Sequence, residues 1–489
     1  MRCGYDVETV RAAERALMGT LPDGALMRRA AFGLATACAD MLGGVYGRRV
    51  VVLAGSGDNG GDALYAAAAL ARRGAGAVAV ELAPERTHPG ALAALRAAGG
   101  RTVAPEDADA VIGRADLVLD GIVGIGGKGG LRPEAARLAE LARRARAAVV
   151  AVDLPSGIDP DTGEVAGEAV RADVTVAFGA YKPGLLIDPG AEHVGALRFT
   201  DIGLGPHLPR TPALEALQHA DVAALLPSPS GESDKYRRGV VGVVAGSERY
   251  PGAAVLAVGG ALRGGAGAVR YVGPGADAVI ARFPETLVSA GPPAKAGRVQ
   301  AWVIGPGLGD DSRARQAVAE VVAADVPVLI DADALRLADR EAVRARRAGT
   351  VLTPHAGEAA ALLDADRGDV EGARLAQVRR LAEEFRATAL LKGSTTLVAG
   401  PDGAAVRVNP TGSAWLSTAG SGDVLSGLTG SLLAAGLSAQ DAASVGAYLH
   451  GLAGRDLPPP FGAHELADRV PLVRASIMDS VTNDALPRT

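Results

Sequence analysis

A glycine-rich turn near the end of the chain, TAGSGDVLSGL at residues 418–428, puts one carboxylate at the start of a predicted helix. Gly420 and Gly422 let the backbone approach a ligand closely and adopt positive φ. The first N–H groups of a helix, together with its dipole, favour a phosphate. Asp423 would face that phosphate as the base for an attacking hydroxyl, which is an arrangement for phosphoryl transfer. Taken alone, the pattern is more typical of an Asp that caps a helix.

Lys392 follows a predicted buried strand in ALLKGSTT (389–396). With Gly393, Ser394 and Thr395 it offers charge, N–H and hydroxyl donors to a nucleotide phosphate. Taken alone, Lys392 fits a solvated turn lysine equally well, and a lone His355 is more typical of a turn or helix cap. Every predicted strand of the second half, however, ends in a polar or glycine cluster, which packing alone does not require. These clusters are Gly246–Ser247, GPGLG (305–309), Asp331 with Asp333, His355 with Glu358, and Lys392.

The first half contains a strand, a glycine-rich turn and a helix in RRVVVLAGSGDNGGDALYAA (48–67). The spacing of its glycines differs from GxGxxG, so the turn predicts a phosphate cradle rather than a dinucleotide fingerprint. Asn59, Asp120 and Ser156 each follow or end a predicted strand, and three such oxygen donors favour a hard cation over zinc. Each of them alone also fits a turn residue.

Two further segments of the first half carry lysines where an anion could bind. The loop GIGGKGG (124–130) exposes many N–H groups, and Lys128 could reach a phosphate. The same composition also describes a flexible loop. FGAYKPGL (178–185) places Lys182 after a strand, where a phosphate or carboxylate partner is expected.

Strands and helices alternate along both halves, which predicts an α/β fold with a doubly wound, mostly parallel sheet and a site at the carboxyl ends of its strands. In the first half, helices are expected at 8–19 and 24–42, and the strands that follow end near 55, 82, 122, 157 and 179. Pro- and Gly-rich stretches at 203–212 and 225–234, with a short helix over 213–226 between them, predict a linker and a domain boundary near residue 212.

Composition limits the function classes. A chain of 489 residues predicts two or three domains, and 48% hydrophobic content supports sizeable cores. The net charge of -5 argues against nucleic-acid binding. Cys3 and Cys38 are too few for a disulfide framework. No apolar run suggests a signal peptide or membrane span, so a cytoplasmic protein is predicted.

Four segments of the first half, GSGDNGGDALYAA, VLDGIVGIGGKGG, AVDLPSG and FGAYKPGL, together resemble the epimerase domain of bifunctional NAD(P)H-hydrate repair enzymes over about residues 1–205. The resemblance implies that Asn59, Asp120 and Ser156 hold potassium. Asp58 and Ala63 stand where the family usually has Asn and Gly, and a carboxylate beside a phosphate is unfavourable unless a cation offsets it. We expect Asp153 to be the acid/base, with Lys182 as the second candidate. The implied substrate contacts are Asp58, Asn59, Gly60, Gly61, Asp62, Gly124, Ile125, Gly126, Gly127, Lys128, Gly129, Gly130 and Asp153.

Six segments of the second half, GSERYPGAA, GPGLG, DADAL, LTPHAGE, LLKGSTT and NPTGSAWLSTAGSGDVLSGL, resemble the ADP/ATP-dependent NAD(P)H-hydrate dehydratase domain, which is similar to ribokinase-type kinases, over about residues 213–475. The implied cofactors are Mg²⁺ and ADP or ATP, with ADP favoured. Nucleotide contacts are implied for Lys392, Gly393, Ser394, Thr395, Thr396 and Gly422, and hydrate contacts for Ala253, Ala254, Gly307, His355 and Asp423.

The predicted function is therefore repair of hydrated NADH and NADPH, with residues 1–212 as the epimerase and residues 213–489 as the dehydratase. Expected partners are these small molecules and an adenine nucleotide, without nucleic acid or membrane, and the sequence leaves a homo-oligomer open. The alternative is a small-molecule kinase of the ribokinase type fused to a nucleotide-binding scaffold domain.

Overall fold

The computed structural model describes residues 1–228, 231–232 and 234–484. The chain forms two compact units, one of Cys3–Ala213 and one of Met1–Arg2 with the chain from Leu214 onward. Part of the predicted linker (229–230 and 233) and the last five residues lie outside the described residues. Among the described residues, no helix is both long and apolar enough to cross a membrane.

The first unit contains a parallel seven-stranded sheet in the order β4-β3-β2-β5-β6-β7-β8. The order reverses between β2 and β5, and in such sheets ligands bind at the carboxyl ends of the strands beside this reversal. The strands are β2 Arg49–Ala54, β3 Gly76–Glu81, β4 Arg101–Val103, β5 Leu117–Gly121, β6 Ala148–Val152, β7 Val174–Phe178 and β8 Ala196–Thr200.

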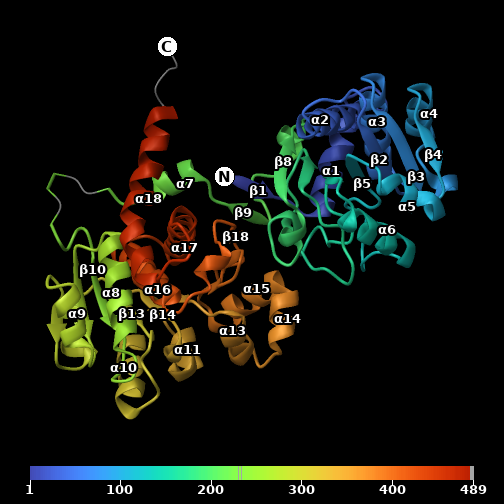
Figure 1. Ribbon diagram of the computed structural model, residues 1–489. Helices are drawn as coiled ribbons and strands as arrows, with labels where there is room; N and C mark the ends of the chain where they lie inside the picture. The colour runs from blue at the N-terminus through green and yellow to red at the C-terminus, as the bar shows by residue number, and fades with distance from the viewer. Residues whose placement is uncertain (229–230, 233, 485–489) are drawn as a thin grey trace. The chain divides into compact units, whose positions relative to one another are not determined.

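Helices cover both faces of this sheet (Figure 1). Alternate strand residues enter two separate apolar cores, because successive side chains of a strand point to opposite faces. Val50 and Val52 pack with one set of helices, and Val51 and Leu53 pack with the other. The first set is α1 Val7–Met18, α2 Ala25–Leu42, α3 Asp58–Arg72 and α4 Pro89–Ala97, and the second is α5 Ala108–Ile112 and α6 Pro133–Arg144.

The second unit contains an eleven-stranded sheet in the order β1-β9-β18-β17-β16-β15-β14-β13-β10-β11-β12. Neighbours from β12 to β16 are parallel, whereas β17 is antiparallel to both β16 and β18. The strands are β1 Arg2–Gly4, β9 Leu214–Ala216, β10 Val240–Val244, β11 Ala268–Val272, β12 Leu287–Ser289, β13 Ala301–Ile304, β14 Val328–Ile330, β15 Thr350–Leu352, β16 Thr388–Leu391, β17 Thr396–Ala399 and β18 Val406–Asn409.

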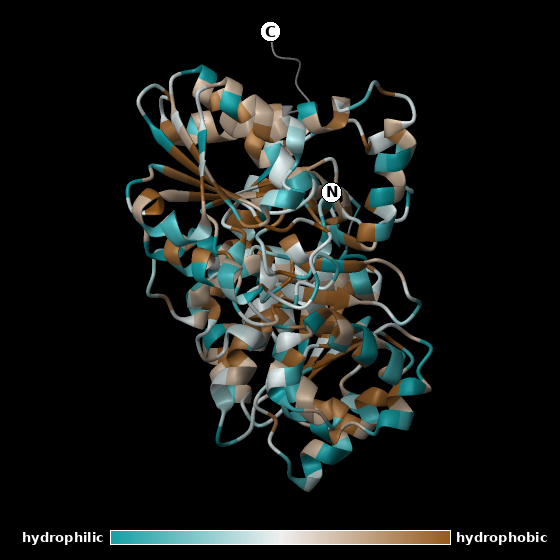
Figure 2. Ribbon diagram, turned by 90° about the vertical axis from the view of Figure 1, so that its right-hand side faces the viewer, coloured by the Kyte–Doolittle hydropathy of each residue, from teal (hydrophilic) through white to brown (hydrophobic). Residues whose placement is uncertain are grey.

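Here too the helices form two layers, and the strands between them are hydrophobic, as the brown ribbons of Figure 2 show. The larger core joins one face of the sheet to α7 His219–Leu225, α8 Pro251–Gly264, α9 Ala276–Arg282, α16 Ser421–Ala434, α17 Ala439–Asp456 and α18 Ala463–Asp484. The other face contacts α10 Ser312–Val322 and α15 Arg374–Phe385, beside which lie α11 Asp333–Leu337, α12 Arg340–Arg344, α13 Ala356–Leu363 and α14 Arg367–Gly372.

The α/β prediction is confirmed, and one local prediction is partly wrong. The segment 213–226 was expected to be helical throughout, but Leu214–Ala216 is a strand and the helix covers only His219–Leu225. Leu214 lies opposite Val406 of β18 in a parallel ladder. Pairing with β18 decides this conformation, because it satisfies backbone groups that local propensity cannot.

Candidate active sites

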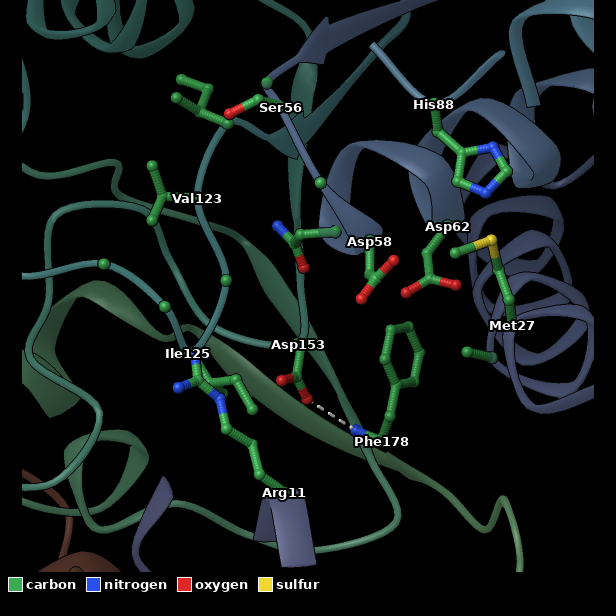
Figure 3. Close-up of a pocket in the computed structure, with 18 of the residues that line it drawn as sticks. Arg11, Met27, Ser56, Asp58, Asp62, His88, Val123, Ile125, Asp153 and Phe178 are labelled. Carbon is green, nitrogen blue, oxygen red and sulfur yellow. Dashed lines mark hydrogen bonds between the residues drawn. The ribbon is translucent and has the colours of Figure 1, made fainter. Parts of the chain in front are cut away.

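A pocket of 1180 Å³ opens in the first unit at the carboxyl ends of β2, β5, β6 and β7. The turn after β2, the loop 122–131 and residues of α1 and α2 line it (Figure 3). Asp58, Asp62 and Asp153 point into the same hollow, with the ring of Phe178 and the side chain of Arg11 at its border. The pocket is therefore acidic on one side and bounded by cationic and glycine-rich segments on another.

Glycine is required where α3 begins. Gly57, the N-cap, has φ of 102° and no side chain to cap the helix, so the first N–H groups of α3 are left for a ligand anion. A Cβ on Gly60 would lie 2.4 Å from the carbonyl oxygen of Gly55. The turn thus folds tightly against its own strand, and it brings Asp58 and Asp62 to the pocket as predicted.

Asp153 and Lys182 form a buried ion pair. Lys182 Nζ lies 2.5 Å from Asp153 Oδ1, and the Phe178 N–H donates to the same oxygen at 2.9 Å. Lys182 is 1% exposed, and Asp153 has a positive φ of 66°, a strained conformation for a residue with a side chain. The lysine therefore has a carboxylate partner, which was one of the two alternatives the sequence left open.

A third group of side chains lies around Asp120, at the end of β5. Its carboxylate accepts hydrogen bonds from the Ser156 N–H at 2.8 Å and hydroxyl at 2.6 Å, and the Ser156 Oγ also lies 3.0 Å from the Val123 carbonyl oxygen. Burial raises the pKa of Asp120 to about 6, although these hydrogen bonds act to lower it. The Asn59 side chain lies against Gly124, and its amide nitrogen is buried without a hydrogen-bond partner.

This group fits a hard cation. Its oxygens belong to a carboxylate, a hydroxyl, an amide and a main-chain carbonyl, which are hard donors. The partners of Asp120 within the described residues are neutral, so a cation would offset the cost of burying its charge. Asp120 and Ser156 are hydrogen-bonded to each other directly. Asn59 is connected to them indirectly, because its side chain lies against Gly124 in the loop that follows Val123.

In the second unit, Lys392 lies at the tip of the β16–β17 hairpin. Its Nζ lies 2.9 Å from Asp331 Oδ1 and 3.6 Å from Glu358 Oε2. Burial alone would lower the pKa of Lys392, but these two carboxylates raise it above its ordinary value. Burial likewise opposes ionisation of Asp331, and Lys392 and Ser426 hold its pKa below the ordinary value. Lys392 therefore remains charged at neutral pH.

A buried arginine shapes the same hairpin tip. Arg374 donates to the carbonyl oxygens of Leu391, Lys392 and Thr395 at 3.1–3.3 Å. A Cβ on Gly393 would lie 2.3 Å from its guanidinium, so only glycine fits beside it. The tip is thus a turn with a fixed shape, and Arg374 is a residue that the motif analysis missed because it lies on a helix remote in sequence.

Asp423 lies in the first turn of α16. Gly420 is the N-cap, in the left-handed conformation with φ of 85°, so the interpretation of Asp423 as the cap is wrong. Burial and the nearby carboxylate of Asp331 together raise the pKa of Asp423 to about 7, although Lys392 opposes this rise. Gly422 lies beside the lysine, because a Cβ there would be 3.6 Å from Lys392 Nζ. A carboxylate that ionises near neutrality is suited to act as a general base.

His450 of α17 fixes the position of this turn. The residue is buried, and its Nε2 lies 2.9 Å from the main-chain oxygen of Ser421. Burial lowers the pKa of His450 to about 4, so the ring is neutral at pH 7 and donates this bond. The sequence showed a histidine in GAYLHGLAG, but no local signal connected it to α16.

Helices α8 and α16 pack backbone to backbone and run parallel. A Cβ on Gly427 would lie 1.9 Å from the Ala257 oxygen, and one on Gly260 would lie 2.2 Å from the Val424 oxygen. Near the start of α16, a Cβ on Gly420 would lie 2.3 Å from Leu256, and near the end of α8, one on Gly264 would lie 2.2 Å from the Ser431 hydroxyl, so the two helices run in the same direction. The amino ends of both helices therefore lie at the same edge of the sheet, where the dipoles favour an anion.

The remaining predicted contacts divide into two groups. Gly307, with φ of 59°, lies against α8, because a Cβ there would be 2.6 Å from the Ala253 Cβ. A Cβ on Gly246 would be 3.0 Å from that of Ala254. His355 caps α13, and its Nδ1 accepts from the N–H groups of Gly357 and Glu358 at 3.0 and 3.2 Å. The structure thus brings Ala253 and Gly307 together and gives His355 the capping role that was its alternative.

The two units therefore define a two-domain α/β protein, with a polar pocket at the carboxyl ends of the strands in the first unit and a lysine–carboxylate cluster in the second. Two family models match the chain: one described as YjeF-related protein N-terminus over residues 23–184, and one described as NAD(P)H-hydrate dehydratase over residues 241–471.

Similar proteins cover most of the chain. The bifunctional NAD(P)H-hydrate repair enzyme Nnr of Mycobacterium tuberculosis is 52% identical over 91% of this chain and 92% of its own. The enzyme of the same name from Escherichia coli is 35% identical over 85% and 82%. Among solved structures, the ADP/ATP-dependent NAD(P)H-hydrate dehydratase of Bacillus subtilis, co-crystallised with ATP/Mg²⁺, is 29% identical over 53% of this chain and 97% of its own, with a TM-score of 0.49.

The chain belongs to the family of bifunctional NAD(P)H-hydrate repair enzymes, which combine an epimerase and a dehydratase. Both predicted resemblances are therefore confirmed.

Proposed function

We propose that residues 1–212 interconvert the R- and S-forms of hydrated NADH and NADPH, and that residues 213–489 return the S-form to the reduced cofactor with ADP or ATP. The observation that carries the second part is the half-buried carboxylate of Asp423, in the first turn of α16 near Lys392. The substrate carries a hydroxyl on the ring carbon next to the nitrogen. Hydroxide is a poor leaving group, whereas phosphate is a good one.

In the proposed dehydration, Asp423 removes the hydroxyl proton as this oxygen attacks the terminal phosphate of the nucleotide. The first N–H groups of α16 near Gly422 stabilise the negative charge of the transferring group. The ring nitrogen lone pair then expels phosphate and restores the dihydronicotinamide. The carboxylates of Glu358 and Asp423 are of the hard type that Mg²⁺ prefers, and this ion would neutralise phosphate charge when bound.

Lys392 is held ready for the nucleotide by its pairing with Asp331 and Glu358. A buried ammonium needs such partners, because an unpaired charge is costly to bury. A nucleotide phosphate would offer it a further anionic partner, and the hairpin tip of Gly393, Ser394 and Thr395 would add N–H and hydroxyl donors. Because Arg374 already fixes this tip, the nucleotide need not order it on binding.

In the proposed epimerisation, Asp153 is the acid/base at the ring hydroxyl and Lys182 fixes its position. The turn at the start of α3 and the loop 124–130 would receive the pyrophosphate of the substrate. Asn59, Asp120 and Ser156 would hold potassium, which supplies positive charge beside that pyrophosphate. We further propose that the enzyme acts in the cytoplasm, with ADP as the usual donor.

The test is to incubate the full chain with mixed epimers of hydrated NADH and with ADP or ATP. We expect the absorbance of the dihydronicotinamide to return completely, with one phosphate released per NADH formed. Asp423→Asn should bind nucleotide but lose this activity, because its amide cannot accept the hydroxyl proton. Accumulation of a stable phosphorylated product would instead favour the small-molecule kinase.

A further inference from the structure

Asp62 is a buried carboxyl group at the wall of the first-unit pocket that the proposed mechanism does not use. The residue is 8% exposed and lines the pocket, where its carboxylate points toward the same hollow as Asp58 and Asp153 (Figure 3). Its Oδ1 is buried without a hydrogen-bond partner. Buried polar atoms are nearly always paired in folded proteins, so this oxygen is an exception that calls for a ligand.

The surroundings of Asp62 disfavour its ionised form. Burial raises its pKa well above the ordinary value, and Asp153, Asp58 and Glu14 raise it further. The charged and titratable side chains that line this part of the pocket or border it are Arg11 and Glu14 of α1, Asp58 of α3, His88 at the N-cap of α4, Asp153 after β6, and Lys182 after β7.

Asp62 and Asp153 therefore lie in opposite environments within one pocket. Asp153 has a lysine at 2.5 Å and a main-chain N–H at 2.9 Å, whereas Asp62 has a hydrophobic neighbour in Met27 and an oxygen without a donor. A buried carboxyl group without a hydrogen-bond donor is suited to be a general acid, and a carboxylate held by a lysine and an N–H group is suited to be a general base.

We propose that Asp62, in its carboxylic acid form, is the proton donor to the departing hydroxyl in epimerisation, and that Asp153 is the base that faces it across the pocket. This inference rests on the proposed epimerase function and names its second catalytic group. It also divides between two residues the acid and base roles first expected of Asp153 alone.

The proposed epimerisation begins with proton transfer from Asp62. Its carboxyl proton passes to the hydroxyl oxygen while the bond from that oxygen to the ring carbon breaks, and water leaves. The ring nitrogen lone pair forms a double bond to the same carbon, giving a cationic ring. Water then adds to the opposite face of this carbon and loses a proton to Asp153, which gives the other epimer. Exchange with solvent returns one proton to Asp62 and removes one from Asp153.

The acidic side of the pocket would stabilise the cationic ring that forms in this step. A cationic ring is stabilised by the carboxylates of Asp58 and Asp153, which lie in the same hollow, whereas the neutral substrate ring gains much less from them. Interactions that strengthen only as charge develops are those that accelerate a reaction. The carboxylate charge of Asp58 is unfavourable beside a phosphate, but it is favourable beside a cationic ring.

The experiment compares Asp62→Asn with Glu81→Gln in the full chain. Glu81 is also 8% exposed and lies on β3 of the same sheet, so it is a matched buried carboxyl group. Each variant receives purified R-hydrate or S-hydrate with excess donor nucleotide. Repair of the S-form needs only dehydration and reports that the chain is folded, whereas repair of the R-form also needs epimerisation.

We expect Asp62→Asn to lower kcat for R-form repair by at least about 100-fold, with KM within about threefold and S-form repair unchanged. Glu81→Gln should repair both forms normally. Undiminished R-form repair by Asp62→Asn, or a change in KM alone, would overturn the inference while leaving the epimerase function standing. Failure of the wild-type chain to use the R-form faster than spontaneous epimerisation would instead remove the epimerase function itself.

A pH profile of the wild type tests the inference without a variant. If Asp62 must be protonated, kcat/KM for epimerisation falls as the pH rises through its raised pKa. A rate that is constant or that increases up to pH 10 would contradict the assignment.

Discussion

The dehydratase should depend on pH through Asp423, because its pKa is raised to about 7. A base acts only when ionised, so kcat/KM should follow the ionised fraction of Asp423 in the free enzyme. With a pKa of about 7, that fraction is about 10% at pH 6 and about 90% at pH 8. We therefore expect kcat/KM to rise about tenfold over this range, whereas an aspartate with an ordinary pKa would give a flat profile.

The cause of the raised pKa of Asp423 can be tested with two neighbouring aspartates, Asp331 directly after β14 and Asp333 at the start of α11. Asp331 raises the pKa of Asp423, so Asp331→Asn should move the midpoint of the profile to lower pH. Asp333, which accepts from the Gly309 N–H at 2.9 Å and pairs with Arg336, provides the matched control. Asp333→Asn should leave the midpoint where it is in the wild type.

The assay is the initial rate of NADH formation from purified S-hydrate at subsaturating concentration with saturating nucleotide, between pH 5.5 and 9. Nonenzymatic dehydration is subtracted at each pH. A flat profile between pH 6 and 8, or the same midpoint in Asp331→Asn as in the wild type, would refute the reasoning that burial beside Asp331 sets the basicity of Asp423.

Three further predictions concern other parts of the sites. Lys182→Met should abolish R-form repair and retain S-form repair, because Asp153 loses the partner that positions it. Gly427→Ala should destabilise the second unit by roughly 2–4 kcal/mol and lower dehydratase activity, because its Cβ would lie 1.9 Å from the Ala257 oxygen. Replacing potassium with tetramethylammonium should lower the melting temperature and R-form repair, because the buried carboxylate of Asp120 would lose the cation that we propose for it.

Each of these three predictions has its own control. Lys295→Met tests lysine loss outside the sites, and Gly368→Ala tests a helical glycine with no atom within 4 Å of the added Cβ. S-form repair in the same solutions controls for the change of salt. Normal R-form repair by Lys182→Met, unchanged unfolding of Gly427→Ala, or epimerisation indifferent to potassium would contradict the corresponding prediction.

The sequence was sufficient to predict the glycine-rich turns, because these turns depend on local backbone geometry. Gly57 and Gly420 have positive φ, and each precedes a helix whose first N–H groups no side chain caps. Alternation of strands and helices likewise predicted the α/β class, since side-chain periodicity is a local property.

Remote contacts could not be predicted in this way. Arg374 and His450 lie on helices without a recognisable motif, yet they fix the hairpin tip and the first turn of α16. Leu214–Ala216 is predicted as helix but forms a strand, because it pairs with β18, which is distant in the chain.

The amino-acid sequence by itself determined the α/β class and which family the chain belongs to, because motifs of glycine and carboxylate record local requirements. Only the tertiary structure decided the surroundings of the aspartates in these motifs. Asp62, Asp153 and Asp423 are the same residue type, but they differ in burial and in charged neighbours. These differences arise from helices and strands that are far apart in sequence, because only packing brings those neighbours together.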